Sequence, residues 1–189
     1  PGLVVSSALF LPDSPEYKAP YPAVLVVCGH SAQAKAYSAY QTACALAAKN
    51  GLAAFIIDPI CQGERYQHLT ADGKVELTST TAGHSLLGVG CMLLGQTVGR
   101  FEIWDGMRAI DYLQSREDID GTKIGCMGNS GGGTQTSYLM ALDDRIVAAS
   151  PACYITSFSK LLNTIGPQDA EQNIHGQLAF GMDLSLIHI

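Results

Sequence analysis

Two continuous apolar segments on either side of a helical pattern restrict the fold of this chain more than any other feature. Residues 23–28 (AVLVVC) and 52–57 (LAAFII) contain no charged side chain, as expected of strands that are covered on both faces. Apolar side chains recur every three or four positions over residues 37–47, and an Asn-Gly pair follows as a helix stop. Strand, helix and strand together form a parallel unit. We therefore predict an α/β protein with a mostly parallel sheet.

The rest of the chain continues this alternation. Further elements are predicted as an outer strand over 3–11, a helix over 101–113, a short strand over 123–127, a helix over 131–142 and a strand over 146–150. Residues 58–97 lack strong periodicity and are interpreted as an elaborated functional loop. Residues 157–177 are interpreted as short helices that cover a sheet edge.

The helix predicted over residues 101–113 is amphipathic. Its apolar positions are expected to face the core: Phe101, Trp104, Met107, Ile110 and Leu113. Its charged positions are expected to face solvent: Arg100, Asp105, Arg108 and Asp111. The Asp-Gly pair at residues 120–121 is interpreted as a turn after this helix.

Composition excludes several classes of protein. The chain has 189 residues, of which 47% are apolar and 15% charged, which suits one domain with a substantial core. The formal net charge is −6 and lysine and arginine do not cluster, so neither nucleic acid nor an anionic membrane surface is expected as a partner. The apolar segment at residues 86–98 is broken by glycines and is shorter than the ~18 residues of a membrane span. We expect a soluble protein, with compartment and oligomeric state left open.

The cysteines and histidines do not form a metal-binding pattern. The six cysteines are scattered without a CxxC pair and are interpreted as buried thiols: Cys28, Cys44, Cys61, Cys91, Cys126 and Cys153. The histidines show neither HxH nor HExxH spacing. We interpret His68, His84 and His175 as ordinary surface or core residues, and we predict no metal.

The strongest chemical signal is the sequence GNSGG at residues 128–132, between a predicted strand and a predicted helix. In this context the G-x-S-x-G pattern is typical of a nucleophile elbow, a sharp turn that lifts the serine clear of the sheet. Gly128 and Gly132 would remove the side chains that collide in such a turn. We therefore predict that Ser130 is a catalytic nucleophile. A phosphate loop is not indicated, because no lysine follows these glycines.

Two backbone N–H groups are candidates for binding a developing oxyanion. The Gly131 N–H begins the predicted helix, whose positive dipole end points toward Ser130. A second donor is expected in the loop after the strand at residues 23–28, and we assign it to the Ser31 N–H. His30 in the same loop could act as a base. A loop-shaping role is favoured, because the base follows the nucleophile in folds with this elbow.

These residues resemble the α/β-hydrolase superfamily, and more narrowly the bacterial esterases of the acetyl xylan esterase and dienelactone-hydrolase-like group. The likeness spans roughly residues 21–183 and is carried by the Ser130 elbow and three segments: YPAVLVVCGH (21–30), DPICQGER (58–65) and WDGMRAIDYL (104–113). The resemblance implies a doubly wound, mostly parallel sheet and a serine-histidine-aspartate mechanism, in which Ser130 attacks an ester carbonyl. It implies no cofactor.

The resemblance also implies where the other catalytic residues should lie. In this superfamily the acid and the histidine follow the nucleophile, on loops after later strands. Only one strand is predicted between Ser130 and Asp183, so we expect both residues beyond Asp183 and little activity in this chain by itself. The acidic pair at residues 143–144 is expected on the far side of the sheet. Asp169 or Glu171 would serve only if the acid lies unusually early.

The last six residues, LSLIHI at 184–189, resemble the translated transposon end that sequencing libraries leave behind. We therefore expect residues 1–183 to form a partial α/β-hydrolase domain, truncated at the C-terminal end of the sheet. Residues 184–189 are expected to lie outside it.

Taken together, the sequence predicts a serine esterase that cleaves short acyl esters, such as acetylated carbohydrates, through an acyl-enzyme on Ser130. Two alternatives remain open. One is a peptidase or thioesterase on the same fold, and the other is a non-catalytic α/β binding domain that retains the elbow. A panel of substrates distinguishes the first alternative from an esterase. Reaction with a fluorophosphonate distinguishes the second alternative from an enzyme with an activated serine.

Overall fold

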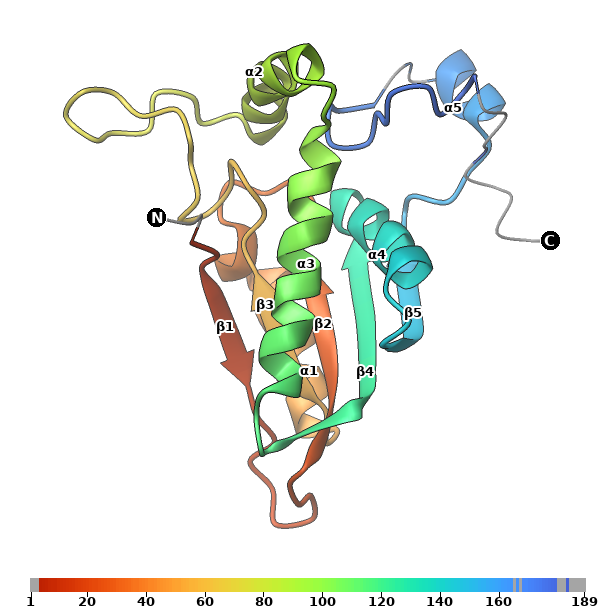
Figure 1. Ribbon diagram of the computed structural model, residues 1–189. Helices are drawn as coiled ribbons and strands as arrows, with labels where there is room; N and C mark the ends of the chain where they lie inside the picture. Colours follow the sequence, from red (N-terminus) through yellow and green to blue (C-terminus); the bar gives the residue numbers. More distant parts are fainter. Residues whose placement is uncertain (1–3, 165, 167, 180–182, 184–189) are drawn as a thin grey trace.

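A five-stranded sheet forms the centre of the protein (Figure 1). The computed structural model describes residues 4–164, 166, 168–179 and 183. The strands have the order β1-β3-β2-β4-β5, where β1 is antiparallel to β3 and the other neighbours are parallel. The strand bounds are β1 (Ser7–Phe10), β2 (Tyr21–Val27), β3 (Ala53–Ile57), β4 (Ile119–Asn129) and β5 (Ile146–Ala152). The α-helix bounds are α1 (Ser38–Lys49), α2 (Thr80–Leu93), α3 (Val98–Gln114), α4 (Gly131–Leu142) and α5 (Phe158–Thr164). The predicted α/β fold with a mostly parallel sheet is confirmed.

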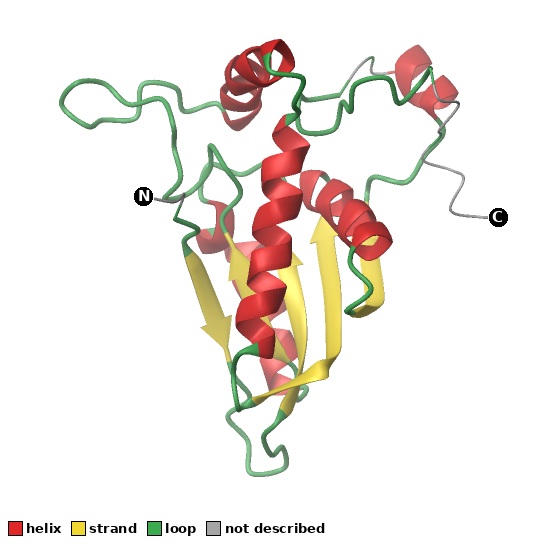
Figure 2. Cartoon of the chain, in the orientation of Figure 1, coloured by secondary structure: helices red, strands yellow, loops and turns green. Residues whose placement is uncertain are grey.

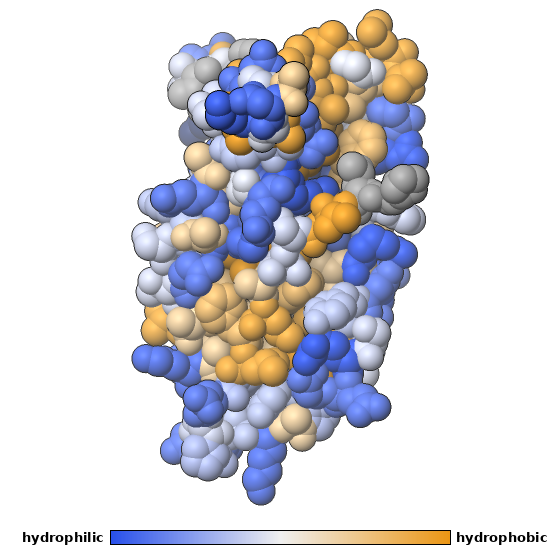
Figure 3. All heavy atoms as spheres, turned by 90° about the vertical axis from the view of Figure 1, so that its left-hand side faces the viewer, coloured by the Kyte–Doolittle hydropathy of each residue, from blue (hydrophilic) through white to orange (hydrophobic). Residues whose placement is uncertain are grey.

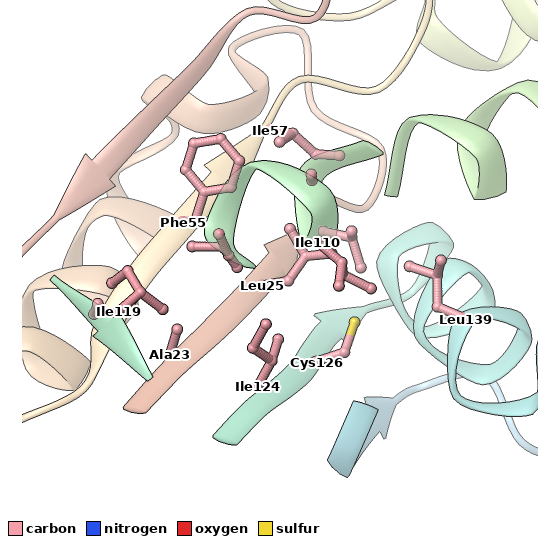
Figure 4. Packing of buried hydrophobic residues seen from close by; sticks show 13 residues of the cluster. Ala23, Leu25, Phe55, Ile57, Ile110, Ile119, Ile124, Cys126 and Leu139 are labelled. Atoms are coloured by element: carbon pink, nitrogen blue, oxygen red, sulfur yellow. The ribbon is translucent and has the colours of Figure 1, made fainter. Parts of the chain in front are cut away.

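Helices cover both faces of the sheet (Figure 2). Helix α1 packs on one face, whereas α3 and α4 pack on the other. Leu25 of β2 lies in a core cluster with Ile110 of α3 and Leu139 of α4 (Figure 4). The next residue, Val26, lies in a second cluster with Cys44 of α1. The continuous apolar sequence of β2 is therefore explained by burial on both faces.

Helix α3 buries most of the stripe that its apolar pattern predicts, with Ile110 and Leu113 fully buried, but two neighbouring positions differ. Trp104 is 57% exposed, with the Arg108 guanidinium 4.4 Å from its ring centre, whereas Asp105, predicted to face solvent, is buried. The buried stripe includes small and acidic residues: Gly99, Glu102, Asp105, Gly106 and Ala109. Gly106 lets α4 approach, because a Cβ there would lie 2.6 Å from Leu139 Cδ1. The close packing of α3 against α4 thus places two carboxyl groups, those of Glu102 and Asp105, in the interior.

A buried ion pair fastens α3 to the loop after β3. Arg65 Nη1 lies 2.7 Å from Asp105 Oδ2 and donates to the Asp58 carbonyl oxygen at 2.9 Å. The Asp58 carboxylate is fully buried and accepts hydrogen bonds from the Lys35 backbone N–H and ammonium, at 2.9 and 2.6 Å. Residues 58–65, the loop after β3, therefore connect the loop after β2 to helix α3, close to the carboxyl edge of the sheet.

The segment predicted as a loop over residues 58–97 contains helix α2. This helix begins where the Ser79 hydroxyl accepts a hydrogen bond from the Ala82 N–H at 3.3 Å. The sequence does not predict this helix, for two reasons. Apolar residues lie around most of its circumference, and three glycines lower its helix propensity: Gly83, Gly88 and Gly90.

Helix α2 also leaves apolar side chains exposed to solvent. Leu86, Val89, Met92 and Leu93 are 56% to 84% exposed. Figure 3 shows hydrophobic side chains gathered at the upper end of the molecule, where α2 lies in Figure 1. None of the helices in the described part of the chain combines the length and the apolar character needed to cross a bilayer.

Smaller differences concern the ends of elements. Strand β4 extends beyond the predicted residues 123–127, and the Asp-Gly pair at 120–121 lies in a register irregularity within it rather than in a turn. Strand β5 continues through Pro151 rather than ending before it. Among the described residues of the segment 157–177, only α5 is helical. Residues 184–189, which we expected outside the domain, lie outside the described residues.

The cysteines follow the expectation of buried thiols with one exception. Cys153 is exposed, and the other five are buried and free. Burial raises the pKa of the Cys44 and Cys61 thiols to about 11 and that of Cys126 to about 12. These thiols are therefore protonated and unreactive at neutral pH.

Candidate active site

The residues that follow strands β2 and β4 meet at the carboxyl edge of the sheet. Gly29 follows β2 closely and Ser130 follows β4, and a Cβ on Gly29 would lie 3.2 Å from Ser130 Cβ. Ser130 has φ 58° and ψ −118° and immediately precedes helix α4. A positive φ is uncommon for a residue with a side chain and persists only where the surrounding structure enforces it.

Neighbouring backbone segments enforce the turn at Ser130. A Cβ on Gly128 would overlap the Gly132 carbonyl oxygen, and a Cβ on Gly132 would overlap the Val27 carbonyl oxygen. The Ser130 N–H donates to the Ala152 carbonyl oxygen at 2.9 Å. The turn is thus clamped between β2 and β5, and a side chain at either glycine would push these segments apart.

Substitution of Gly132 by alanine is expected to destabilise the protein, because the new Cβ meets backbone atoms of β2 that cannot rotate away. The free energy of unfolding should fall by ~1–3 kcal/mol or more, as overpacking of a core does. Gly90→Ala in α2 is the matched control, since a Cβ there meets no atom within 4 Å. It should stabilise the protein by up to ~1 kcal/mol through helix propensity. Urea denaturation measures both, and equal effects would contradict a clamped turn.

The two predicted oxyanion donors lie at this edge of the sheet. Gly131 is buried at the first position of α4, where the positive end of the helix dipole adds to the positive potential at its N–H. Ser31 lies in the loop after β2, where its carbonyl oxygen accepts from the Ala34 N–H at 3.0 Å. The assignment of both N–H groups to an oxyanion site stays a prediction.

A pocket of ≈ 390 Å³ opens beside Ser130. Its other walls come from the residues around the end of β5 and from the segment that returns over the sheet: Pro151, Cys153, Tyr154, Ile155, Thr156, Leu161, Gln168 and Gln172. This volume lies within the range of pockets that bind small molecules.

Four ionisable side chains meet next to the serine turn. His30 Nε2 lies 2.7 Å from Asp169 Oδ2 and 3.1 Å from Glu171 Oε1. His84 Nδ1 lies 2.6 Å from the same Asp169 oxygen and 3.4 Å from Glu171 Oε2. The group reaches the turn itself, because a Cβ on Gly131 would overlap Glu171 Oε1. We refer to these two histidines and two acidic residues as the His/carboxylate cluster.

The sequence analysis considers each member of this cluster separately and does not predict that the four side chains meet. His84, interpreted as an ordinary histidine in a loop, is fully buried in helix α2. His30 and His84 bond to Asp169 across 139 and 85 positions of sequence, so no local spacing reveals the pairing. Glu102 of α3 is a further buried acidic residue beside the cluster. In the sequence, Glu102 could be noticed only as a glutamate four residues after Val98, on the side of the helix that is buried.

The cluster shifts the pKa values of its members. Burial raises the pKa of the Asp169 carboxyl, but hydrogen bonds from His30 and His84 outweigh this effect and lower it to about 2. Burial lowers the pKa of His30, but hydrogen bonds to Asp169 and Glu171 outweigh it and raise the value to about 10. Burial and the Glu171 charge raise the pKa of the Glu102 carboxyl well above its usual range. A positive His30 imidazole therefore lies beside the two carboxylates.

The remaining acidic and histidine candidates lie away from Ser130. Asp143 follows the far end of α4, where Arg145 Nη2 lies 2.6 Å from its carboxylate. Because α4 has 12 residues, this end is about 18 Å from the serine turn. The expected position of residues 143–144 on the far side of the sheet agrees with this geometry. His175 is exposed and lies outside the cluster.

Comparison with known proteins identifies relatives that are longer than this chain. No protein-family model matches it. Over 73 residues it is 36% identical to "Putative hydrolase YtaP" of Bacillus subtilis (strain 168), a match that covers 39% of this chain and 24% of that protein. Methylesterase BT1017 superposes with a TM-score of 0.57 at 29% identity, covering 80% of this chain and 29% of the methylesterase. A "putative acetyl xylan esterase" of Bacteroides fragilis NCTC 9343 superposes with a TM-score of 0.73 at 18% identity, covering 93% of this chain and 50% of the esterase.

The chain thus spans half or less of the length of each of these proteins. The B. fragilis structure, at 18% identity, is evidence of a shared fold. The methylesterase shares more sequence and adds a second esterase to the structures that superpose on the chain. This chain has the α/β-hydrolase fold, and its structural neighbours include esterases of that type.

Proposed function

We propose that this chain carries the nucleophile and the oxyanion site of a serine esterase that cleaves short acyl esters, such as acetyl groups on carbohydrates. The observation that carries the proposal is the backbone of Ser130, held at positive φ between β2 and β5 at the carboxyl edge of a parallel sheet. The esterases among the structural neighbours support the class of reaction. One of them is named as an acetyl xylan esterase, which supports an acylated carbohydrate as substrate.

In the proposed reaction, Ser130 Oγ attacks the ester carbonyl carbon and gives its proton to a general base. The Gly131 and Ser31 N–H groups donate to the carbonyl oxygen as it becomes negative. Collapse of the tetrahedral intermediate expels the alcohol, which takes up the proton, and leaves an acyl-serine. Water then hydrolyses the acyl-serine to the carboxylic acid and the free enzyme.

The general base and its acid are proposed to follow Ser130 at later positions of the whole protein, as in the superfamily. In the described part of the chain, His30 and His84 bond to Asp169. The proteins that the chain matches extend well beyond its length, which leaves room for further strands and loops. The pocket beside Ser130 is proposed to accept the acyl group.

A fluorophosphonate probe tests this proposal, because it reacts only with an activated serine. The whole protein, expressed from its complete gene, should be labelled on the peptide that contains Ser130, and the Ser130→Ala variant should stay unlabelled. Ser137→Ala is the matched control, since the Ser137 hydroxyl donates to the Gly133 carbonyl at 2.9 Å within α4. A folded protein that takes no label would contradict the proposal and favour a non-catalytic binding domain.

A substrate panel tests the finer assignment. Aryl acetate should be hydrolysed faster than an aryl ester with a long acyl chain, a thioester or an anilide. Preference for the thioester or the anilide would replace the esterase assignment with a thioesterase or a peptidase.

A further inference from the structure

We propose that the His/carboxylate cluster binds a divalent transition-metal ion of the zinc class, next to the serine turn. Two imidazoles and two carboxylates are donor types that Zn²⁺ accepts in proteins. The four side chains offer ligand atoms that all lie within 4.8 Å of one another. Four atoms at ~2.0–2.2 Å from a tetrahedral zinc ion lie ~3.3–3.6 Å apart. The nitrogen–oxygen distances in the cluster are 2.6–3.4 Å, so small side-chain shifts would admit the ion.

The orientation of His84 is that of a metal-binding histidine. Its Nε2 lies 2.8 Å from the Ile60 carbonyl oxygen, which can only accept, so Nε2 carries a hydrogen and donates it. Its other ring nitrogen, Nδ1, lies 2.6 Å from Asp169 Oδ2. At this distance either the Nδ1 proton or a metal ion lies between the nitrogen and the carboxylate oxygen. Histidines that bind metals nearly always donate their other ring N–H to a carbonyl or a carboxylate.

A third carboxyl group beside the cluster offers a buried oxygen atom that could act as an outer partner of a bound ion. Glu102 is 2% exposed, and its Oε1 lies 3.8 Å from His84 Nε2. Among the described residues this oxygen has no hydrogen-bond partner. Three acidic side chains thus converge on two histidines in a buried site.

The position of the cluster gives the ion a structural task. The cluster joins the loop after β2, helix α2 and residues 168–172. Gln168 and Gln172 of that last segment line the pocket beside Ser130. A bound ion would therefore fix the pocket wall to the sheet. We assign it no step of the reaction at Ser130.

Zinc titration of the chelator-treated whole protein tests the site, with calorimetry for affinity and elemental analysis for stoichiometry. One ion per chain is expected, with a rise in melting temperature of about 5–10 °C at zinc concentrations ~100-fold above the dissociation constant. His84→Ala should weaken zinc binding by more than the ~10–100-fold that loss of an outer-shell partner costs, and should remove the thermal shift.

Two further variants separate loss of the site from loss of the fold. Glu102→Gln keeps the size of the side chain and should weaken zinc binding ~10–100-fold, as loss of an outer carboxylate does. His175→Ala changes an exposed histidine outside the cluster and should bind zinc like the parent chain. Absence of zinc binding in the parent chain, or equal affinity in all three variants, would show that the cluster is an ion-pair network without a metal. None of these measurements depends on ester hydrolysis, so they stand apart from the test of Ser130.

Discussion

Replacement of Ser130 by alanine in the whole protein is expected to lower kcat for an aryl acetate by a factor on the order of 10⁶, as removal of the nucleophile from a serine-histidine-aspartate site does. The alanine variant cannot form the acyl-enzyme. Its remaining rate would come from substrate binding and the oxyanion donors, which together leave ~10³–10⁴-fold catalysis over water. Initial rates at saturating substrate measure the effect.

The control for this experiment is Ser137→Ala in the same helix. The Ser137 hydroxyl bonds to the Gly133 carbonyl and takes no part in the proposed reaction, so its loss should leave kcat close to that of the parent protein. Circular dichroism confirms that both variants are folded. If Ser130→Ala retained the parent rate, the hydrolysis would have to be assigned to another group.

Replacement of Asp105 by alanine is expected to lower the free energy of unfolding by ~3–5 kcal/mol, because it leaves the Arg65 guanidinium buried without its counter-charge. The Arg65 side chain is 3% exposed, and its Nη1 lies 2.7 Å from Asp105 Oδ2. Burial raises the pKa of the Asp105 carboxyl, and Arg65 offsets part of this rise. Both groups are therefore poorly solvated and depend on each other. Urea denaturation of the 189-residue chain measures the loss.

Asp72→Asn is the matched control for the buried pair. Asp72 Oδ2 lies 2.7 Å from Lys74 Nζ, the same separation, but both side chains are mostly exposed to solvent. Water screens such a pair, so the urea midpoint should stay unchanged within error. A similar shift for Asp105→Ala and Asp72→Asn would mean that burial adds nothing to the Arg65 pair.

The sheet could be predicted because its signals are local. The apolar segments at 23–28 and 52–57 report burial on both faces, and the motif at residues 128–132 marks the turn between β4 and α4. Helix α2 could not be predicted, since its packing against the loop after β3 compensates for glycines that disfavour a helix. In α3 the prediction was wrong at Trp104 and Asp105 for a related reason: Asp105 is buried because Arg65, 40 positions earlier, neutralises it.

The candidate site could be predicted only where it follows the chain. Ser130 and Gly131 belong to one contiguous motif, so their proximity is certain from the sequence. The His/carboxylate cluster is assembled by tertiary structure alone, because a loop, two helices and a later segment supply its members and Glu102. A single sequence contains no information on which of its five histidines will meet which of its acidic residues.

Ser130 can reach its backbone conformation only after strands that are distant in sequence have assembled. Its N–H bonds to Ala152 of β5, and Gln135 of the following helix donates to the Cys28 carbonyl at the end of β2, 107 positions away. Contacts between such distant residues form late, because closing the intervening loop costs chain entropy before any contact is gained. A nascent or partly folded molecule therefore lacks the positive-φ turn at Ser130. On the proposed function, reactivity at Ser130 would therefore arise only with the finished sheet.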